Sequence, residues 1–207
     1  MRLISFLCMV LLVSLANAGD PAHTPKGVTT HFIGVDYHLA WVDAGEGNRA
    51  ITNEYLAEGA TLEDWETMVA VRKWPNLTEV KQVSGPYLSQ INASFVRKAE
   101  VYSPPPGTVG TDFVLKCYLA PPDKSYLEYN LIRFGIEPGE KGVKSYQFAV
   151  RGPYSLENAI EFNSARLGER LDALTKLRLS VRTNIPSHSN AQPASTELAS
   201  PTESVSE

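Results

Sequence analysis

Cysteine is scarce in this chain, with two in 207 residues, and basic residues do not outnumber acidic ones. Two cysteines are too few for a disulfide-stapled miniprotein or for a four-cysteine zinc site. The formal net charge of −4 gives no reason to expect a protein that binds nucleic acid. Glycine and proline number 14 each, which is near average usage and excludes collagen-like and low-complexity chains.

Catalytic and metal-binding motifs are missing as well. The sequence contains no GxSxG or SxxK nucleophile motif, no HExxH and no paired CxxC. His31 and His38 have opposite parity on an extended strand, so their side chains are expected on opposite sides, where they cannot share a metal ion. We therefore expect no metal site and no cofactor.

An export signal is present at the N-terminus. Arg2 precedes an apolar run from Leu3 to Leu15, and Ala16-Asn17-Ala18 forms a small-x-small cleavage site. The run is too short for a membrane-spanning helix, which needs about 20 apolar residues. The sequence predicts a signal peptide over residues 1–18 and an exported protein, periplasmic or secreted, with no transmembrane segment after cleavage.

The C-terminus has the composition of a disordered tail. Residues 183–207 are rich in Ser, Thr and Pro, contain glutamate but no Lys or Arg, and show no apolar period. Residues 19–182 are left as a single folded domain. Its one cysteine, Cys117, alternates with Phe113, Leu115 and Leu119, which predicts a buried small hydrophobic side chain.

The first half of this domain reads as three strands and a helix. Strands are expected over 32–42, 49–56 and 64–71, and in the last of these Trp65 alternates in phase with Val69. A helix, kinked or split at Gly85-Pro86, is expected over 77–102.

The second half repeats this order, with strands expected over 113–119, 126–136 and 143–151. Short turns make them an antiparallel meander. A helix with Ser155 as N-cap follows, and it carries an apolar stripe of Leu156, Ile160, Leu167, Leu171 and Leu174. The expected fold is α+β: an antiparallel sheet of about six strands, in two three-stranded meanders, with two main helices packed on it.

Two resemblances accompany this reading. The segment from Asn53 to Trp65, continuing to Met68 and Val71, resembles a stretch of small secreted bacterial proteins of unassigned function. The order of elements is similar to that of PsbP/Mog1-like α+β sandwiches. That second similarity implies an accessory or interaction module rather than an enzyme, although fold analogy is a weak guide to function.

Four residues are candidates for a binding site. Arg133 shares strand parity with apolar neighbours, and Arg151 ends the next strand, so the two could be neighbours in a hairpin. With Tyr146 and Trp65 they could line a pocket for an anionic group, because a guanidinium offers a planar fork to carboxylate or phosphate. The alternative is that Arg133 pairs with a nearby glutamate or extends its stem to solvent.

A cluster of carboxylates offers a different hypothesis. A hydrolase could use two of them as acid and base, whereas the plainer interpretation is a solvated turn. The cluster consists of Glu54, Glu58, Glu63, Asp64 and Glu66.

Together these patterns predict an exported, non-enzymatic binding or accessory module of the cell envelope or extracellular space. Its partner would be an unknown protein or a small envelope component. Two alternatives stay open: a hydrolase using the carboxylates around residues 54–66, and a carrier of an amphipathic anion using Arg133 and Arg151.

Overall fold

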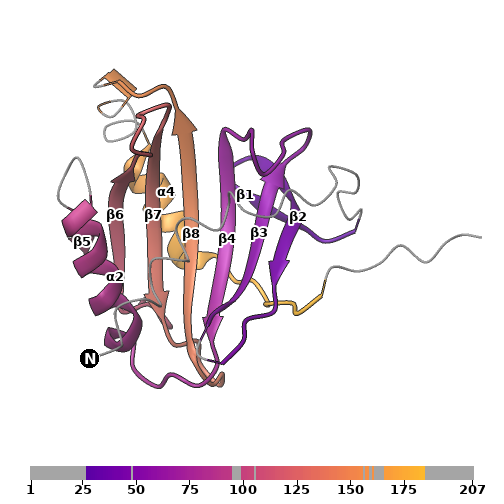
Figure 1. Ribbon diagram of the computed structural model, residues 1–207. Helices are drawn as coiled ribbons and strands as arrows, with labels where there is room; N and C mark the ends of the chain where they lie inside the picture. The colour runs from indigo at the N-terminus through magenta and orange to yellow at the C-terminus, as the bar shows by residue number, and fades with distance from the viewer. Residues whose placement is uncertain are drawn as a thin grey trace, which may run out of the picture.

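The computed structural model describes residues 27–47, 49–94, 99–104, 106–155, 157–158, 160 and 166–184. These residues form one eight-stranded antiparallel sheet with the strand order β1-β2-β3-β4-β8-β7-β6-β5 (Figure 1). The strands are β1 (Thr29–Phe32), β2 (Val35–Asp43), β3 (Ile51–Ala57), β4 (Thr67–Trp74), β5 (Glu100–Tyr102), β6 (Phe113–Leu119), β7 (Leu127–Gly135) and β8 (Val143–Gly152). The predicted signal peptide and almost all of the predicted tail lie outside the described residues.

The predicted number of about six strands was wrong, and the two helices are short elements rather than main ones, although the α+β class holds. Each half contributes a four-stranded meander, β1–β4 and β5–β8, and the halves join where β4 pairs with β8 over eight register positions, Thr67↔Val150 to Trp74↔Val143. Within the described part of the chain, only two short helices occur as elements: α2 (Lys81–Ser94) and α4 (Leu167–Lys176).

The two additional strands are β1 and β5, and neither was evident from composition. Phe32 pairs with Val35 across a two-residue turn in which Ile33 and Gly34 have φ values of 48° and 79°. The strand expected over 32–42 therefore spans the last residue of β1, this turn and most of β2. At the other end, the helix expected to reach residue 102 gives way to β5, which pairs with β6 from Glu100↔Lys116 onward.

The second predicted helix is interrupted. Ser155 does accept a hydrogen bond from the Asn158 backbone N–H at 3.1 Å, as expected of an N-cap. However, Arg166 adopts a left-handed conformation with φ 58°, and α4 starts only at the next residue. From there Leu167, Leu171 and Leu174 pack on the sheet as predicted.

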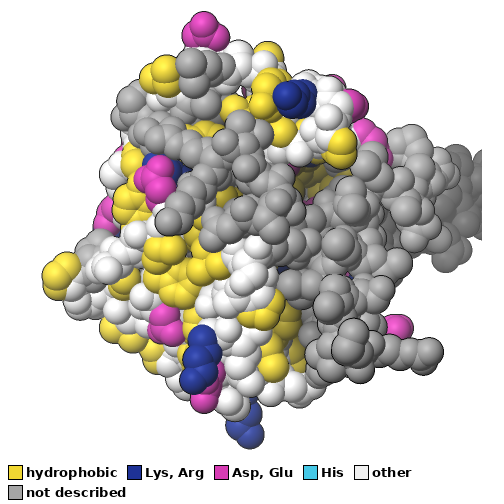
Figure 2. All heavy atoms as spheres, turned by 60° about the vertical axis from the view of Figure 1, so that its left-hand side comes forward, with side chains coloured by type: hydrophobic (Ala, Val, Ile, Leu, Met, Phe, Trp, Pro, Cys, Tyr) yellow, Lys and Arg dark blue, Asp and Glu magenta, His cyan; other side chains and the backbone are white. Residues whose placement is uncertain are grey.

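The two helices cover opposite faces of the sheet (Figure 1). On the face that we call the α4 face, Leu174 and Leu177 pack with inward side chains of β2–β4 and β6–β8, among them Leu39, Val69 and Leu131. On the α2 face, Val80 and Val83 pack on β6, β7 and β8, against a cluster of Leu115, Cys117, Leu119, Ile132, Phe134 and Val143. Figure 2 shows the side of the molecule that carries β5 and α2, where hydrophobic and charged side chains are interspersed.

Cys117 is 1% exposed and lies with Leu115 and Leu119, which confirms its predicted burial. The predicted phase of Trp65 was wrong. Trp65 packs with Met68 and Ala149 on the α2 face, opposite to Val69. β4 begins only at Thr67, so strand alternation does not extend back to Trp65.

Candidate functional site

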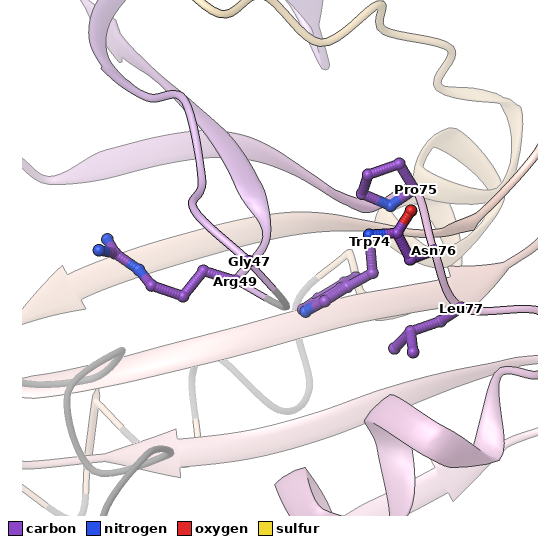
Figure 3. A pocket seen from close by; sticks show the side chains of 6 residues that line it. All are labelled: Gly47, Arg49, Trp74, Pro75, Asn76 and Leu77. Atoms are coloured by element: carbon purple, nitrogen blue, oxygen red, sulfur yellow. The ribbon is translucent and has the colours of Figure 1, made fainter.

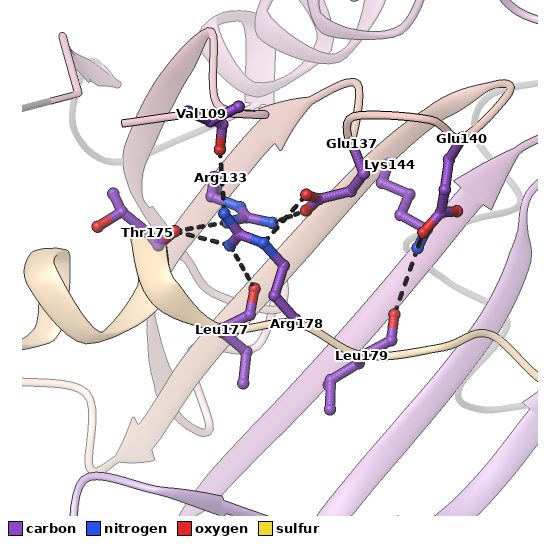
Figure 4. A network of polar contacts seen from close by, with 9 residues as sticks. All are labelled: Val109, Arg133, Glu137, Glu140, Lys144, Thr175, Leu177, Arg178 and Leu179. Carbon is purple, nitrogen blue, oxygen red and sulfur yellow. Dashed lines mark hydrogen bonds and ion pairs between the residues drawn. The ribbon is translucent and has the colours of Figure 1, made fainter. Parts of the chain in front are cut away.

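Arg133, on β7, lies on the α4 face and is 0% exposed. Its guanidinium carbon is 4.0 Å from the ring centroid of Tyr146, its neighbour on β8. Nη1 donates to the Thr175 carbonyl oxygen at 2.7 Å, and Nη2 pairs with the Glu137 carboxylate (Figure 4). The arginine therefore ties the end of α4 to the centre of the sheet.

A second guanidinium reaches the same carboxylate. Arg178 Nε lies 3.0 Å from Glu137 Oε2, while its Nη2 donates to the Val109 carbonyl oxygen at 3.0 Å (Figure 4). We call Arg133, Glu137, Tyr146, Thr175 and Arg178 the Arg133 cluster. Burial lowers the pKa of Arg133, and the Glu137 charge opposes that change.

The α2 face carries a second polar network, which runs across the four central strands. We call it the polar ladder, and its members are Glu54 on β3, Arg72 on β4, Gln147 and Arg151 on β8, and Asn130 and Glu128 on β7. All six are buried or half-buried.

Hydrogen bonds and one ion pair link the ladder from one end to the other. Arg72 donates to Glu54 Oε1 at 3.3 Å and, through Nη1, to the side-chain carbonyl of Gln147. Gln147 donates to the Asn130 side chain, and Asn130 Nδ2 donates to Glu128 Oε1 at 3.1 Å. Arg151 Nη2 closes the row 3.7 Å from Glu128 Oε2. A glutamate–arginine pair thus lies at each end of the row, and the two amides join them in the middle.

The ladder environment disfavours ionised carboxylates. Burial raises the pKa of Glu54, and the nearby Arg72 charge partly offsets this. Burial likewise raises the pKa of Glu128, against the hydrogen bond from Asn130 and the Arg151 charge. The two carboxylates also repel each other, because the charge of Glu128 contributes to the raised pKa of Glu54.

Arg151 ends the ladder between two aromatic rings. Its guanidinium carbon is 4.0 Å from the Trp65 ring centroid and 4.2 Å from that of Tyr126. Nη1 donates to the Glu63 carbonyl oxygen at 3.1 Å, in the turn between β3 and β4. Arg151 is therefore held rigidly beside an exposed turn.

The structure separates the four residues predicted as one pocket into two pairs. Arg133 stacks on Tyr146 on the α4 face, and Arg151 stacks on Trp65 on the α2 face. Tyr146 and Arg151 are five residues apart on β8, so their side chains leave the sheet on opposite sides.

The predicted carboxylate cluster also divides. Glu54 belongs to the ladder, whereas the others are exposed around the β3–β4 turn: Glu58, Glu63, Asp64 and Glu66. Sequence reasoning missed Arg72, Gln147 and Asn130. The spacing of Glu128 and Asn130, two residues apart on one strand, was a usable signal that polar side chains share a face.

Two hollows are found besides these networks, and the second shares Arg178 with the Arg133 cluster. One is shallow and is lined by Gly47, Arg49, Trp74, Pro75, Asn76 and Leu77; in Figure 3 the Arg49 side chain points away from Trp74. The other, an open hollow of about 410 Å³, lies between the β1–β2 turn and the end of α4. Its lining consists of Thr30, His31, Phe32, Ile33, Ala173, Lys176, Leu177 and Arg178.

Among the residues that the structure describes, no three His, Cys, Asp or Glu side chains converge as metal ligands, and no helix is long and apolar enough to cross a membrane. The fold and its two networks define the class: a single-sheet α+β protein with a polar network on each face.

The chain belongs to an uncharacterised protein family, whose model matches residues 25–179. No curated protein and no solved structure matches it. The matched span contains all eight strands and α4.

Proposed function

We propose that this protein is an exported, non-enzymatic binding or accessory module of the cell envelope or extracellular space. The observation that carries the proposal is the polar ladder, in which each of the four charged side chains contacts another member. Groups held in this way order four strands and give the sheet a rigid polar face. A rigid face is what specific binding requires, because fewer groups must be immobilised when the partner arrives.

Arg151 is the residue that we propose for contact with a partner, and Trp65, which is 6% exposed, positions it by stacking on its guanidinium. Arg151 lies beside the exposed β3–β4 turn and keeps 17% of its side chain accessible. Arg133 and Tyr146 are 0% and 1% exposed and serve instead to hold the C-terminal segment. The partner class remains an unknown protein or a small envelope component, and export rests on the N-terminal sequence.

The similarity to PsbP/Mog1-like sandwiches lends the proposal little support. It was based on three strands and a helix in each half, whereas the sheet has four strands in each half. An accessory role is therefore argued from the ladder alone.

The test is native mass spectrometry of the exported protein purified from its own source. A stoichiometric protein or small molecule that accompanies the chain would support the proposal. Arg151→Gln should then weaken that association, whereas Lys141→Gln, an exposed change on the β7–β8 turn, should leave it unchanged. A bare monomer that hydrolyses an envelope ester or glycoside would contradict it.

One observation favours a hydrolase as the second candidate. Burial raises the pKa of both Glu54 and Glu128, and the Glu128 charge adds to the rise at Glu54, so each carboxyl favours the protonated form in which it could act as a general acid. Glu54→Gln and Glu128→Gln would then each abolish turnover while the folded structure persists. Equal activity in both variants and the wild type would exclude this role for the ladder.

A further inference from the structure

The β1–β2 hairpin turns through an unfavourable residue. A two-residue turn with positive φ at both positions favours Asn or Asp first and Gly second. Here the first position is Ile33, with φ 48°, followed by Gly34. Positive φ is a genuine outlier for a β-branched side chain. Backbone strain of this kind is concentrated at functional sites, which draws attention to the contacts of the Ile33 side chain.

The Ile33 side chain faces the end of α4. It packs against the core cluster that includes Leu177, and both residues line the open hollow of about 410 Å³. Phe32 and Ala173 complete the apolar part of the lining. Sites for small ligands typically span about 300–1,000 Å³ and combine an apolar wall with a few polar groups. The hollow meets both conditions.

The lining also carries basic side chains. His31, Lys176 and Arg178 belong to it, and no carboxylate does. Their acidic partners lie outside the lining: Asp36 is 2.7 Å from His31, Asp172 is 2.7 Å from Lys176, and Glu137 is 3.0 Å from Arg178. The first two pairs are solvent-exposed on both sides, so they contribute little energy and can be redirected to a ligand.

The end of a helix ordinarily repels an anion, because its last carbonyl oxygens carry partial negative charge. At the end of α4 arginines neutralise these carbonyls. Thr175 O accepts hydrogen bonds from Arg133 at 2.7 Å and from Arg178 at 2.8 Å, and Leu177 O accepts one from Arg178 at 2.9 Å. The arginines are engaged in these contacts, so the group at the edge of the hollow that an incoming anion can bind directly is the Lys176 ammonium, which is 72% exposed.

We propose that the hollow between the β1–β2 turn and α4 binds a small amphipathic anion, with its apolar part on Ile33 and Leu177 and its charged group beside Lys176 and Arg178. This inference rests on the proposed binding function and names a ligand class and a site for it. From its unfavourable turn position, Ile33 supplies the apolar wall of this site. The site is separate from the Arg151 contact, which lies on the opposite face of the sheet.

The experiment titrates the full exported chain with dodecanoate by isothermal calorimetry and compares it with uncharged 1-dodecanol. Ile33→Asn should raise the melting temperature, since Asn suits a left-handed turn position, and should weaken dodecanoate binding about tenfold by removing the apolar wall. Lys176→Gln should weaken dodecanoate but not dodecanol. Arg49→Gln, in the other hollow, is the matched control and should change neither.

Three outcomes would overturn the inference. Absence of dodecanoate binding to the wild type would do so, while the proposed function would survive if native mass spectrometry still finds a partner. Binding that is unaffected by Ile33→Asn and Lys176→Gln but weakened by Arg151→Gln would place the site on the other face. Dodecanol binding as tightly as dodecanoate would remove the role of charge. Loss of binding only in the two hollow variants supports the site.

Discussion

The Arg133 cluster and the polar ladder use the same residue types in different geometries. In the cluster, two guanidiniums converge on the one carboxylate of Glu137, which is 5% exposed. In the ladder, charges and amides follow one another in a row, and its charged side chains are 12–17% exposed. The members of the convergent cluster all depend on one shared acceptor, Glu137, whereas a row can be interrupted and leave two shorter rows.

The two networks also join different parts of the chain. The cluster connects β7 and the following turn to the end of α4 and to Val109, so it holds the C-terminal segment against the sheet. The ladder connects β3, β4, β8 and β7, which are already joined by backbone hydrogen bonds. Loss of the cluster should therefore detach the C-terminal segment from the sheet. Loss of the ladder should only make the α2 face less rigid, because backbone hydrogen bonds still hold the strands together.

The largest effect is expected from Arg133→Met. The change removes the hydrogen bond to Thr175 O and one of the two guanidiniums on Glu137. Removing one partner of a buried ion pair typically costs about 3–5 kcal/mol, and the remaining contact between Glu137 and Arg178 places the expected loss at the lower end of that range. Guanidinium chloride unfolding should show a loss in this range. Arg178→Met is the control, since the Arg178 side chain is 45% exposed and its removal leaves the Arg133–Glu137 pair intact. Equal losses of unfolding free energy in the two variants would contradict the conclusion that Arg133 contributes more to stability than Arg178.

A smaller effect is expected when the ladder is broken in the middle. Arg72→Met removes the donor to both Glu54 and Gln147, which should cost about 1–3 kcal/mol for buried acceptors left unpaired. The same unfolding assay measures it, with Lys141→Met as an exposed control that should change stability by no more than about 0.5 kcal/mol. A loss of unfolding free energy as large as that of Arg133→Met would mean that the two halves of the ladder do not persist independently.

Much of the fold could be predicted because apolar alternation is a strong signal. β6 was predicted with its observed bounds, and β7 and β8 within about one residue, since each alternates clearly and ends in a turn of Pro, Gly or Asp. β1 was missed because Ile33 is not a turn residue by composition. β5 was missed because three residues are too few to show a period.

The site could be predicted only in parts. Strand parity correctly placed Arg133 with Tyr129 and Leu131, and it could also have separated Tyr146 from Arg151 on β8. It could not reveal that Glu137, beyond the end of β7, and Arg178, beyond the end of α4, meet at one place. Those contacts depend on how α4 lies across the sheet, which no local pattern encodes.

The ladder should respond to pH in a direction that its burial determines. The pKa of Glu128 in the folded protein is raised above its ordinary value of 4.5, so its contribution to stability is complete below that value and is lost as pH rises through the folded pKa. Glu128→Gln keeps an acceptor for Asn130 but cannot ionise. Its stability relative to the wild type should therefore rise as pH increases from about 4.5, measured by urea unfolding from pH 4 to 8. A constant difference across this range would contradict the raised pKa.

The smallest effect, with the opposite sign in pH, is expected at Glu140. This carboxylate accepts hydrogen bonds from Lys144 Nζ at 2.7 Å and from Lys73 Nζ at 2.8 Å, and those contacts lower its pKa. Its contribution to stability is present above the ordinary value of 4.5 and is lost as pH falls through the folded pKa. Because the side chain is 39% exposed, solvent screening should limit the cost of Glu140→Gln to about 0.5 kcal/mol near neutral pH.

The difference in unfolding free energy between Glu140→Gln and the wild type should vanish on acidification. The unfolding free energy of Glu128→Gln, in contrast, should increase relative to the wild type as pH rises. The two carboxyl groups share no hydrogen-bond partner among those described. In the double variant the two pH-dependent differences should therefore add. Strong non-additivity would mean that the buried row and the exposed pair belong to one electrostatic unit, and the separation between buried networks and solvent-screened pairs would no longer hold.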